Sequence, residues 1–278
     1  MDFSLFDSGN FFTDLAAERR EAMPNACGVD FKKSRERGFL WERIKITNEK
    51  GEAEIGRPIG RYDTLITERA DRISGEGIFD AAEEVARELC LLFENKKIIP
   101  ERILVIGLGN EALTPDSLGA KCVSKINATM QLPKSAREDI SEIAVFAPGV
   151  SSKCGIESVE AVIAICERIM PDAVIAIDAL TARSPLRLGC TVQFSDTGIY
   201  PGSGVGRVKR GLNLMTLGVP VISVGMPTVV SAEAFCREGG CGDFSSMLVA
   251  PREIDLIVER ASDIISLGIN QAFGIALI

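Results

Sequence analysis

From about residue 76 onward, apolar residues alternate between helical spacing and short continuous runs. The helical spacing is clearest at Ile78, Ala82, Val85, Leu89 and Leu92, and it also predicts helices near 114–126, 159–166, 209–217 and 253–266. The continuous runs predict strands at 103–107, 142–149, 173–178, 190–196 and 219–225. Val- and Ile-rich strands that alternate with helices are typical of a largely parallel sheet covered on both faces. We therefore expect a single α/β domain of a phosphorylase/hydrolase-like kind, with a mostly parallel sheet and helices on both faces.

The first 75 residues have a different pattern, because they are polar and charge-rich with little helical periodicity. The stretch "RIKITNEKGEAEIG" (43–56) predicts a hairpin that turns at residues 48–51. We expect an N-terminal hairpin and coil extension over 15–75, followed by the α/β domain over 76–278. The chain stops on the apolar "FGIALI", which leads us to expect a truncated form.

The charge and the cysteines narrow the class of protein. A net charge of −8 argues against broad binding to nucleic acid or a membrane surface, although Arg207, Lys209 and Arg210 offer a local basic patch. The N-terminus lacks the features of a secretory signal, and no apolar run is as long as a membrane span. Eight scattered cysteines without a C-x-x-C motif predict buried, reduced thiols in a cytoplasmic protein.

The sequence contains no histidine. This excludes Ser-His-Asp and Cys-His catalysis, and it excludes zinc sites of the H-E-x-x-H type. Acid–base chemistry near neutral pH must therefore use carboxylates, lysine, tyrosine or a thiol. Cys154 beside Lys153 is a weak candidate nucleophile, because no histidine base is present to activate it.

The stretch "LVIGLGNEALTPDSLGAK" (104–121) has two interpretations. Gly107, Gly109 and Ala112 loosely match a dinucleotide-binding fingerprint. That fold needs a helix directly after the glycines and an acid at the end of the next strand, about 20 residues on. Here we expect the helix to start later, with Thr114 as N-cap and Pro115 in its first turn. The loop therefore favours presentation of a carboxylate, Asp116, over binding of a phosphate.

A second acid, Asp178, ends the predicted strand "AVIAID". The carboxyl ends of parallel strands line the ligand crevice of open α/β sheets, so Asp116 and Asp178 are expected in one crevice, within about one water's reach of each other. Two facing carboxylates can share a proton, and one then acts as base on a water while the other acts as acid. The alternatives are structural: Asp116 suits a helix dipole, and Asp178 can cap a loop.

A glycine-rich loop, "DTGIYPGSGVGR" (196–207), follows another predicted strand. Its backbone N–H groups at Gly202, Ser203, Gly204 and Gly206 are candidates for holding an extended peptide or an oxyanion. The alternative is a flexible turn.

At these residues the sequence resembles the spore germination proteases. The segments "FFTDLAAE", "GLGNEALTPDSLG", "APGV", "IDALTARS", "DTGIYPGSGVG" and "GVPVISVGMPTVV" occur in order and span about residues 11–235. Arg207 stands where the family pattern has asparagine. The fold of this family is similar to that of the hydrogenase-maturation peptidases, which share the G-x-G-N and acid-x-x-G pattern and add a histidine that this chain lacks.

The resemblance implies an aspartic-type endopeptidase that degrades small acid-soluble spore proteins during germination, in the cytoplasm of the spore core. Its implied catalytic pair falls on Asp116 and Asp178. It also implies a homo-oligomer (a tetramer) and a self-processed zymogen, with the scissile bond at Asp14–Leu15 and a propeptide over residues 1–14. We expect a poorly buried N-terminal end to reach the crevice, and we expect no cofactor and no metal. The rival hypotheses are a Mg²⁺-dependent phosphohydrolase that uses the same carboxylates and a non-catalytic binding module.

Overall fold

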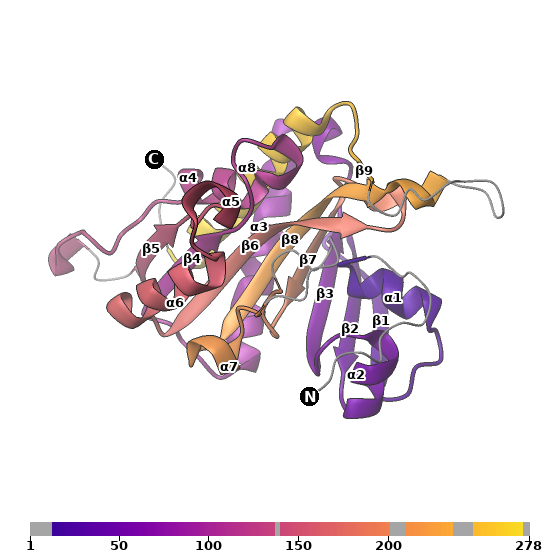
Figure 1. Cartoon of the computed structure of the whole chain (residues 1–278), viewed down its shortest axis with the longest axis horizontal. Coiled ribbons are helices and arrows are strands. Elements are labelled where there is room, and N and C mark those ends of the chain that lie inside the picture. The colour runs from indigo at the N-terminus through magenta and orange to yellow at the C-terminus, as the bar shows by residue number, and fades with distance from the viewer. Residues whose placement is uncertain (1–12, 137–139, 201–209, 236–246, 275–278) are drawn as a thin grey trace.

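The computed structural model describes residues 13–136, 140–200, 210–235 and 247–274, and these form one sheet with helices on both faces (Figure 1). Within these residues the sheet has nine strands in the order β1-β2-β3-β7-β8-β6-β4-β5, and β9 pairs with β8. The strands are β1 (Val29–Glu36), β2 (Phe39–Ile46), β3 (Gly60–Ile66), β4 (Arg102–Gly107), β5 (Glu142–Phe146), β6 (Ala173–Ala182), β7 (Thr191–Ser195), β8 (Val221–Ser231) and β9 (Leu248–Val249). The α-helices are α1 (Ala16–Ala22), α2 (Glu49–Ile55), α3 (Gly75–Asn95), α4 (Leu118–Lys125), α5 (Ser151–Cys154), α6 (Ser158–Ile169), α7 (Leu214–Leu217) and α8 (Ile254–Ala272).

The single α/β domain expected from the sequence is confirmed. Strands β8, β6, β4 and β5 pair in parallel, and the connections between successive members contain helices, as parallel crossovers require. These are the Val- and Ile-rich runs of the sequence, and they are covered by helices on both faces.

The parallel part of the sheet is smaller than expected. Strands β1, β2, β3 and β7 pair antiparallel with one another, and β7 pairs antiparallel with β8. Only the short 3₁₀ turn Pro185–Arg187 lies between β6 and β7, which is too little chain for a parallel crossover. The strands of the segment 15–75 thus continue the main sheet, and the boundaries at residues 14 and 75 stay predictions.

The hairpin predicted at 43–56 is wrong. Residues 48–51 begin helix α2, because the Asn48 side chain accepts a hydrogen bond from the Gly51 N–H (2.9 Å) and caps the helix. The hairpin lies earlier in the chain, between β1 and β2, and it turns through Arg37 and Gly38, both with positive φ. Asn and Gly are favoured in turns and at helix N-termini alike, so the same letters fit both structures.

Helix boundaries also differ from the sequence expectation at three places. Residues 114–116 form a 3₁₀ turn, and the α-helix α4 begins only at Leu118. Helix α7 covers only Leu214–Leu217 of the predicted 209–217. Residue 209 itself lies outside the described part of the chain. Helix α8 continues to Ala272, six residues beyond the predicted end at 266.

The two faces of the sheet bury different groups of helices. Helices α3, α4 and α8 pack on one face over side chains such as Val105, Ile177 and Phe194. On the other face, α6 and α7 cover the parallel half and α1 and α2 cover the antiparallel half (Figure 1). On this second face, the cavity described below lies over β6, β7 and β8, between the α6–α7 group and the α1–α2 group.

A buried charged cluster joins α3 to the antiparallel half of the sheet. Arg43 Nη1 of β2 lies 2.7 Å from Glu88 Oε2 of α3 and 3.5 Å from Asp63 Oδ2 of β3. The Glu88 and Asp63 side chains are each 1% exposed, and each has one carboxyl oxygen without a hydrogen-bond partner. Burial first, and then the charge of Asp63, raise the pKa of Glu88 from 4.5 to about 7. Glu88 therefore keeps its proton to a higher pH than an exposed glutamate does.

The cysteines only partly match the prediction. Cys122 and Cys166 are buried, whereas Cys27, Cys90 and Cys154 are exposed and Cys190 is intermediate; all six are free thiols. No helix among the described residues is both long and apolar enough to cross a membrane.

Candidate active site

A cavity of about 700 Å³ lies on the sheet face between the α1–α2 pair and the start of α5 and α6. Strands β6, β7 and β8 form its floor, and the loop after β4 closes one end. Its polar lining includes Asp14, Arg57, Tyr62, Asp116, Ser151, Ser152, Asp178, Gln193, Ser195 and Thr228. Both candidate carboxylates and the residue before the expected scissile bond therefore face one cavity.

Asp116 is positioned by close backbone packing of the loop that follows β4. Its main-chain oxygen and its Oδ2 both accept from the Asn110 N–H, at 3.0 and 2.9 Å. Gly109 has φ +100°, and a Cβ there would lie 2.0 Å from the Asp116 main-chain oxygen. Gly107 needs to be glycine for a similar reason, since its Cβ would lie 2.2 Å from the Gly119 oxygen. These glycines allow the loop to fold back on itself, which accounts for the G-x-G pattern without a nucleotide.

Asp178 is the most perturbed acid of the cavity. It sits near the middle of β6, on the cavity face, and its Oδ1 accepts from the Ala179 N–H at 2.9 Å. Burial, then the charge of Asp116, then that of Asp14, raise the pKa of Asp178 well above its usual value. Burial also raises the pKa of Asp116, against the lowering effect of the Asn110 N–H. The two carboxyls line the same cavity, and the charge of Asp116 acts on Asp178; the distance between them, expected to be about one water's reach, stays a prediction.

The chain's own N-terminal segment enters this cavity. The Asp14 N–H donates to the Thr181 oxygen (2.8 Å), and the Thr181 N–H donates to Asp14 Oδ2 (2.9 Å). Arg57 Nη2 lies 3.5 Å from Asp14 Oδ1. For the described residues 13–15, the expectation of a poorly buried end is wrong, because Leu15 is fully buried among Leu180, Ala182, Leu188 and Val230. Residues 13–15 are thus docked on the end of β6 through the hydrogen bonds between Asp14 and Thr181.

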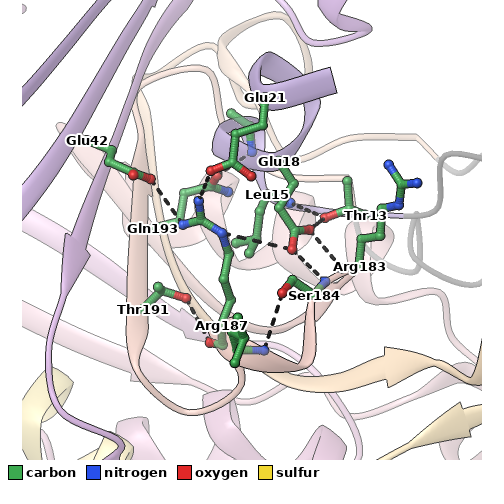
Figure 2. Close-up of polar contacts among 12 residues, drawn as sticks. Thr13, Leu15, Glu18, Glu21, Glu42, Arg183, Ser184, Arg187, Thr191 and Gln193 are labelled. Carbon is green, nitrogen blue, oxygen red and sulfur yellow. Dashed lines mark hydrogen bonds and ion pairs between the residues drawn. The ribbon is translucent and has the colours of Figure 1, made fainter. Parts of the chain in front are cut away.

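Residues just after Leu15 are fastened to the body of the protein (Figure 2). The buried Glu18 of α1 accepts from the backbone N–H groups of Arg183 and Ser184, each at 2.7 Å, and from the Thr13 hydroxyl. Arg187 joins the same region, since its guanidinium lies between carboxylates of α1 and β2, 2.5 Å from Glu21 and 3.0 Å from Glu42. Helix α1 is therefore held to the end of β6 by charge-assisted hydrogen bonds on both sides.

Several predicted residues do not enter the described site. Gly202, Ser203, Gly204, Gly206 and Arg207 lie outside the described residues, although Gly198, Ile199 and Tyr200 at the start of the same loop line the cavity. Cys154 is exposed and is not part of the cavity lining. In the part of the chain that the structure describes, no three His, Cys, Asp or Glu side chains gather as metal ligands. The absence of a metal requirement stays a prediction.

Sequence reasoning missed two side chains of the site, Arg57 and Gln193. The strand "CTVQFSD" did contain a signal for Gln193. Val192 and Phe194 are apolar and buried on the α3 face, while Gln193 and Ser195 alternate with them and face the cavity. Polar residues with a period of two indicate that one face of this strand lines a polar space. Arg57 had no such signal, because it lies in an irregular segment between α2 and β3.

The fold and the site together define an α/β protein that presents two acids, with perturbed pKa values, to a polar cavity. This is an arrangement suited to acid–base chemistry. Residues 8–239 match the family model described as germination protease, and the chain belongs to this family. Family membership favours the peptidase hypothesis over the phosphohydrolase and binding-module hypotheses.

Individual relatives agree with the family match. The germination protease of Caldanaerobacter subterraneus subsp. tengcongensis is 34% identical, over 94% of this chain and 93% of its own length. The germination protease of Clostridium acetobutylicum is 34% identical over 95% of each chain, and that of Bacillus subtilis is 39% identical over 79% of this chain and 63% of its own. Among solved structures, the NiFe hydrogenase maturation protease HycI of Thermococcus kodakarensis aligns with 64% of this chain and 98% of its own, at 18% identity and a TM-score of 0.36.

Proposed function

We propose that this chain is an aspartic-type endopeptidase that initiates the degradation of small acid-soluble spore proteins during germination, with Asp116 and Asp178 as its catalytic pair. The observation that carries this proposal is the shared cavity, which both acids and the chain's own Asp14 line. Family membership supports the protein substrate and the germination role. The spore-core cytoplasm and a homotetramer belong to the same proposal.

The different environments of the two acids suggest their roles. Asp178 keeps its proton to higher pH, because it is buried and faces two other carboxylates, so it is the general acid. Asp116 accepts a backbone N–H that favours its ionised form, so it is the general base.

In the reaction, Asp116 takes a proton from a water whose oxygen attacks the scissile carbonyl carbon. A tetrahedral intermediate forms, its carbon–nitrogen bond breaks, and Asp178 gives its proton to the departing nitrogen. The rate falls as pH rises through the pKa of Asp178, because the acid form is then lost. The direction matches activation by mild acidification.

The same chemistry accounts for a zymogen. Asp14 lines the cavity and is docked on β6, which supports the inference that the uncleaved Asp14–Leu15 bond blocks access to the two acids and is itself a substrate. Cleavage there frees a 14-residue propeptide and leaves a mature chain that begins at Leu15. The anchored α1 then stays as part of the cavity's surroundings.

The test is incubation of the purified full chain at mildly acidic pH, alone and with a small acid-soluble spore protein. N-terminal sequencing and mass spectrometry identify the products. The wild type should yield Leu15 as a new N-terminus and should cleave the spore protein. Asp116→Asn and Asp178→Asn should do neither, while the exposed Asp80→Asn on α3 serves as the matched control. An intact Met1 under all conditions would contradict the zymogen, and cleavage by Asp178→Asn would contradict the catalytic pair.

A further inference from the structure

The Gln193 side chain on β7 is hydrogen-bonded to the backbone on both sides of Leu15. Its Nε2 donates to the Asp14 carbonyl oxygen at 3.1 Å, and its Oε1 accepts from the Ala16 N–H at 2.7 Å. The orientation of the amide follows from its partners, since a carbonyl only accepts and a backbone N–H only donates. One side chain therefore fixes the position of the peptide from the Asp14 carbonyl to the Ala16 nitrogen.

The strand that carries Gln193 is held on both sides. Gln193 lies in register with Thr64 of β3 and with Gly225 of β8, so β7 is an interior strand of the sheet. Its neighbours Val192 and Phe194 are fully buried in the opposite core. Gln193 itself is 8% exposed and lines the cavity together with Asp116 and Asp178. A donor on such a support is preorganised, because little reorganisation is needed when charge develops near it.

The oxygen that Gln193 contacts has a defined place in the proposed reaction. Under the proposed function, on which this inference rests, Asp14 O is the oxygen of the scissile carbonyl. During attack by water this oxygen gains negative charge, and a neutral N–H donor at hydrogen-bond distance stabilises that charge. Because Gln193 is uncharged, it supplies this stabilisation without becoming a third acid or a base beside the pair.

We propose that Gln193 is a further catalytic residue, which binds the scissile carbonyl oxygen of the Asp14–Leu15 bond and stabilises the oxyanion formed during self-processing. No covalent bond to Gln193 forms or breaks. Its Nε2–H stays donated to the same oxygen from the ground state to the tetrahedral intermediate, and the hydrogen bond strengthens as charge develops. Its Oε1 keeps the Ala16 side of the bond in place while the carbon–nitrogen bond breaks.

Two variants distinguish donation of a hydrogen bond to the Asp14 carbonyl oxygen from a purely structural role in holding the segment. Gln193→Met removes the donor and the acceptor without adding charge and nearly keeps the side-chain length. Gln193→Glu keeps an acceptor for the Ala16 N–H, loses the donor when ionised, and regains an O–H donor when protonated. Gln131→Glu, at an exposed position away from the cavity, is the matched control for the same chemical change.

The measured quantity is the first-order rate at which the Leu15 terminus appears in the full chain, over a range of pH. Loss of one oxyanion donor typically lowers a rate about 100- to 1000-fold. Gln193→Met should lose rate by about that factor at every pH. Gln193→Glu should lose as much at neutral pH and recover as pH falls, whereas Gln131→Glu should follow the wild type. Thermal unfolding of each variant in an Asp178→Asn background, which keeps the chain intact, shows whether the segment is still docked.

The outcomes distinguish this inference from the proposed function. If the wild type never yields Leu15, or Asp178→Asn still does, the proposed function fails together with the inference. If wild type and Asp178→Asn behave as expected but Gln193→Met processes within a few-fold of wild type, the inference alone is overturned. A Gln193→Glu variant that is folded and slow, with no recovery at low pH, would likewise overturn the donor role. Should Gln193→Met fail to fold, the pH profile of Gln193→Glu decides.

Discussion

Replacing Glu88 with glutamine should make the stability of this protein less dependent on pH. In the folded chain Glu88 faces Asp63 of β3 and Arg43 of β2. Arg43 in turn contacts Glu36 of β1, and Arg61 pairs with Asp63 at 3.0 Å. Two carboxyls with one unpartnered oxygen each, on Asp63 and Glu88, meet in this cluster. A proton held between them accounts for both oxygens.

The expected magnitude follows from the pKa of Glu88. It is raised from 4.5 to about 7, because burial and the Asp63 charge disfavour the ionised form. The folded state thus binds this proton more tightly than the unfolded state. The associated stability is fully present below pH 4.5 and is lost as pH rises through about 7. At about 1.4 kcal/mol per pKa unit, the loss is roughly 3 kcal/mol.

Glutamine imitates the protonated form, since it can donate to Asp63 and accept from Arg43. We therefore expect Glu88→Gln to match the wild type near pH 4 and to be more stable by roughly 3 kcal/mol near pH 8. Urea unfolding at both pH values, followed by the fluorescence of the buried Trp41, gives the difference between the two chains. Trp41 is the only tryptophan of the sequence, so the signal has one source. Both chains should carry Asp178→Asn so that they remain intact.

Because wild type and variant differ only at Glu88, the contributions of all other titrating groups to the pH dependence of stability cancel in the comparison. Glu83→Gln on the solvent side of the same helix controls for the loss of one carboxylate from α3, since the Glu83 side chain is 52% exposed. A stability difference between Glu88→Gln and wild type that stays constant from pH 4 to pH 8 would refute proton binding by Glu88.

Three further outcomes are expected. Gly109→Ala should lower the free energy of unfolding by about 2–4 kcal/mol and displace Asp116, since its Cβ would lie 2.0 Å from the Asp116 main-chain oxygen. The control Gly149→Ala, at φ +70° with open space around it, should lower it by only about 1 kcal/mol, and equal unfolding midpoints of the two variants would contradict this. Glu18→Gln should lower the free energy of unfolding by about 2 kcal/mol, because two backbone N–H groups lose a charged acceptor, and an unchanged urea midpoint would count against it. Peptidase activity should survive EDTA, and a loss restored by a divalent ion would overturn the metal-free mechanism.

The parallel half of the fold was predictable from sequence, because short runs rich in Val and Ile, such as 173–178, are typical of strands buried on both faces. The antiparallel half was not, since the direction of β7 depends on a short connection after β6 and not on the residues of β7 itself. Asn48 was misread, because capping a helix and forming a turn use the same side-chain hydrogen bond.

The sequence predicted that Asp116 and Asp178 share one crevice, and both line the cavity, although the expected strand ends are wrong: β6 continues past Asp178 to Ala182, and Asp116 lies in the 3₁₀ turn at 114–116. The site was not predictable where the partner is far along the chain. Gln193 of β7 meets Asp14 only because residues 13–14 dock at the end of β6, at the cavity that Gln193 also lines, a contact across 179 positions. No local pattern encodes such a pairing, although the alternation of polar and apolar residues in β7 did show that Gln193 faces away from the larger core.

The docking of Asp14 on β6 has a consequence for the order of the processing reaction. A bond that lies at its own chain's cavity has an effective concentration set by geometry and not by the amount of protein in solution. Under the proposed function, the half-time of processing should therefore be the same in dilute and in concentrated samples. Added wild-type protein should not rescue an Asp178→Asn chain, because that chain's scissile bond stays docked in its own inactive cavity. Each molecule would thus be processed once and irreversibly, at a rate set by the local pH and not by the concentration of other copies.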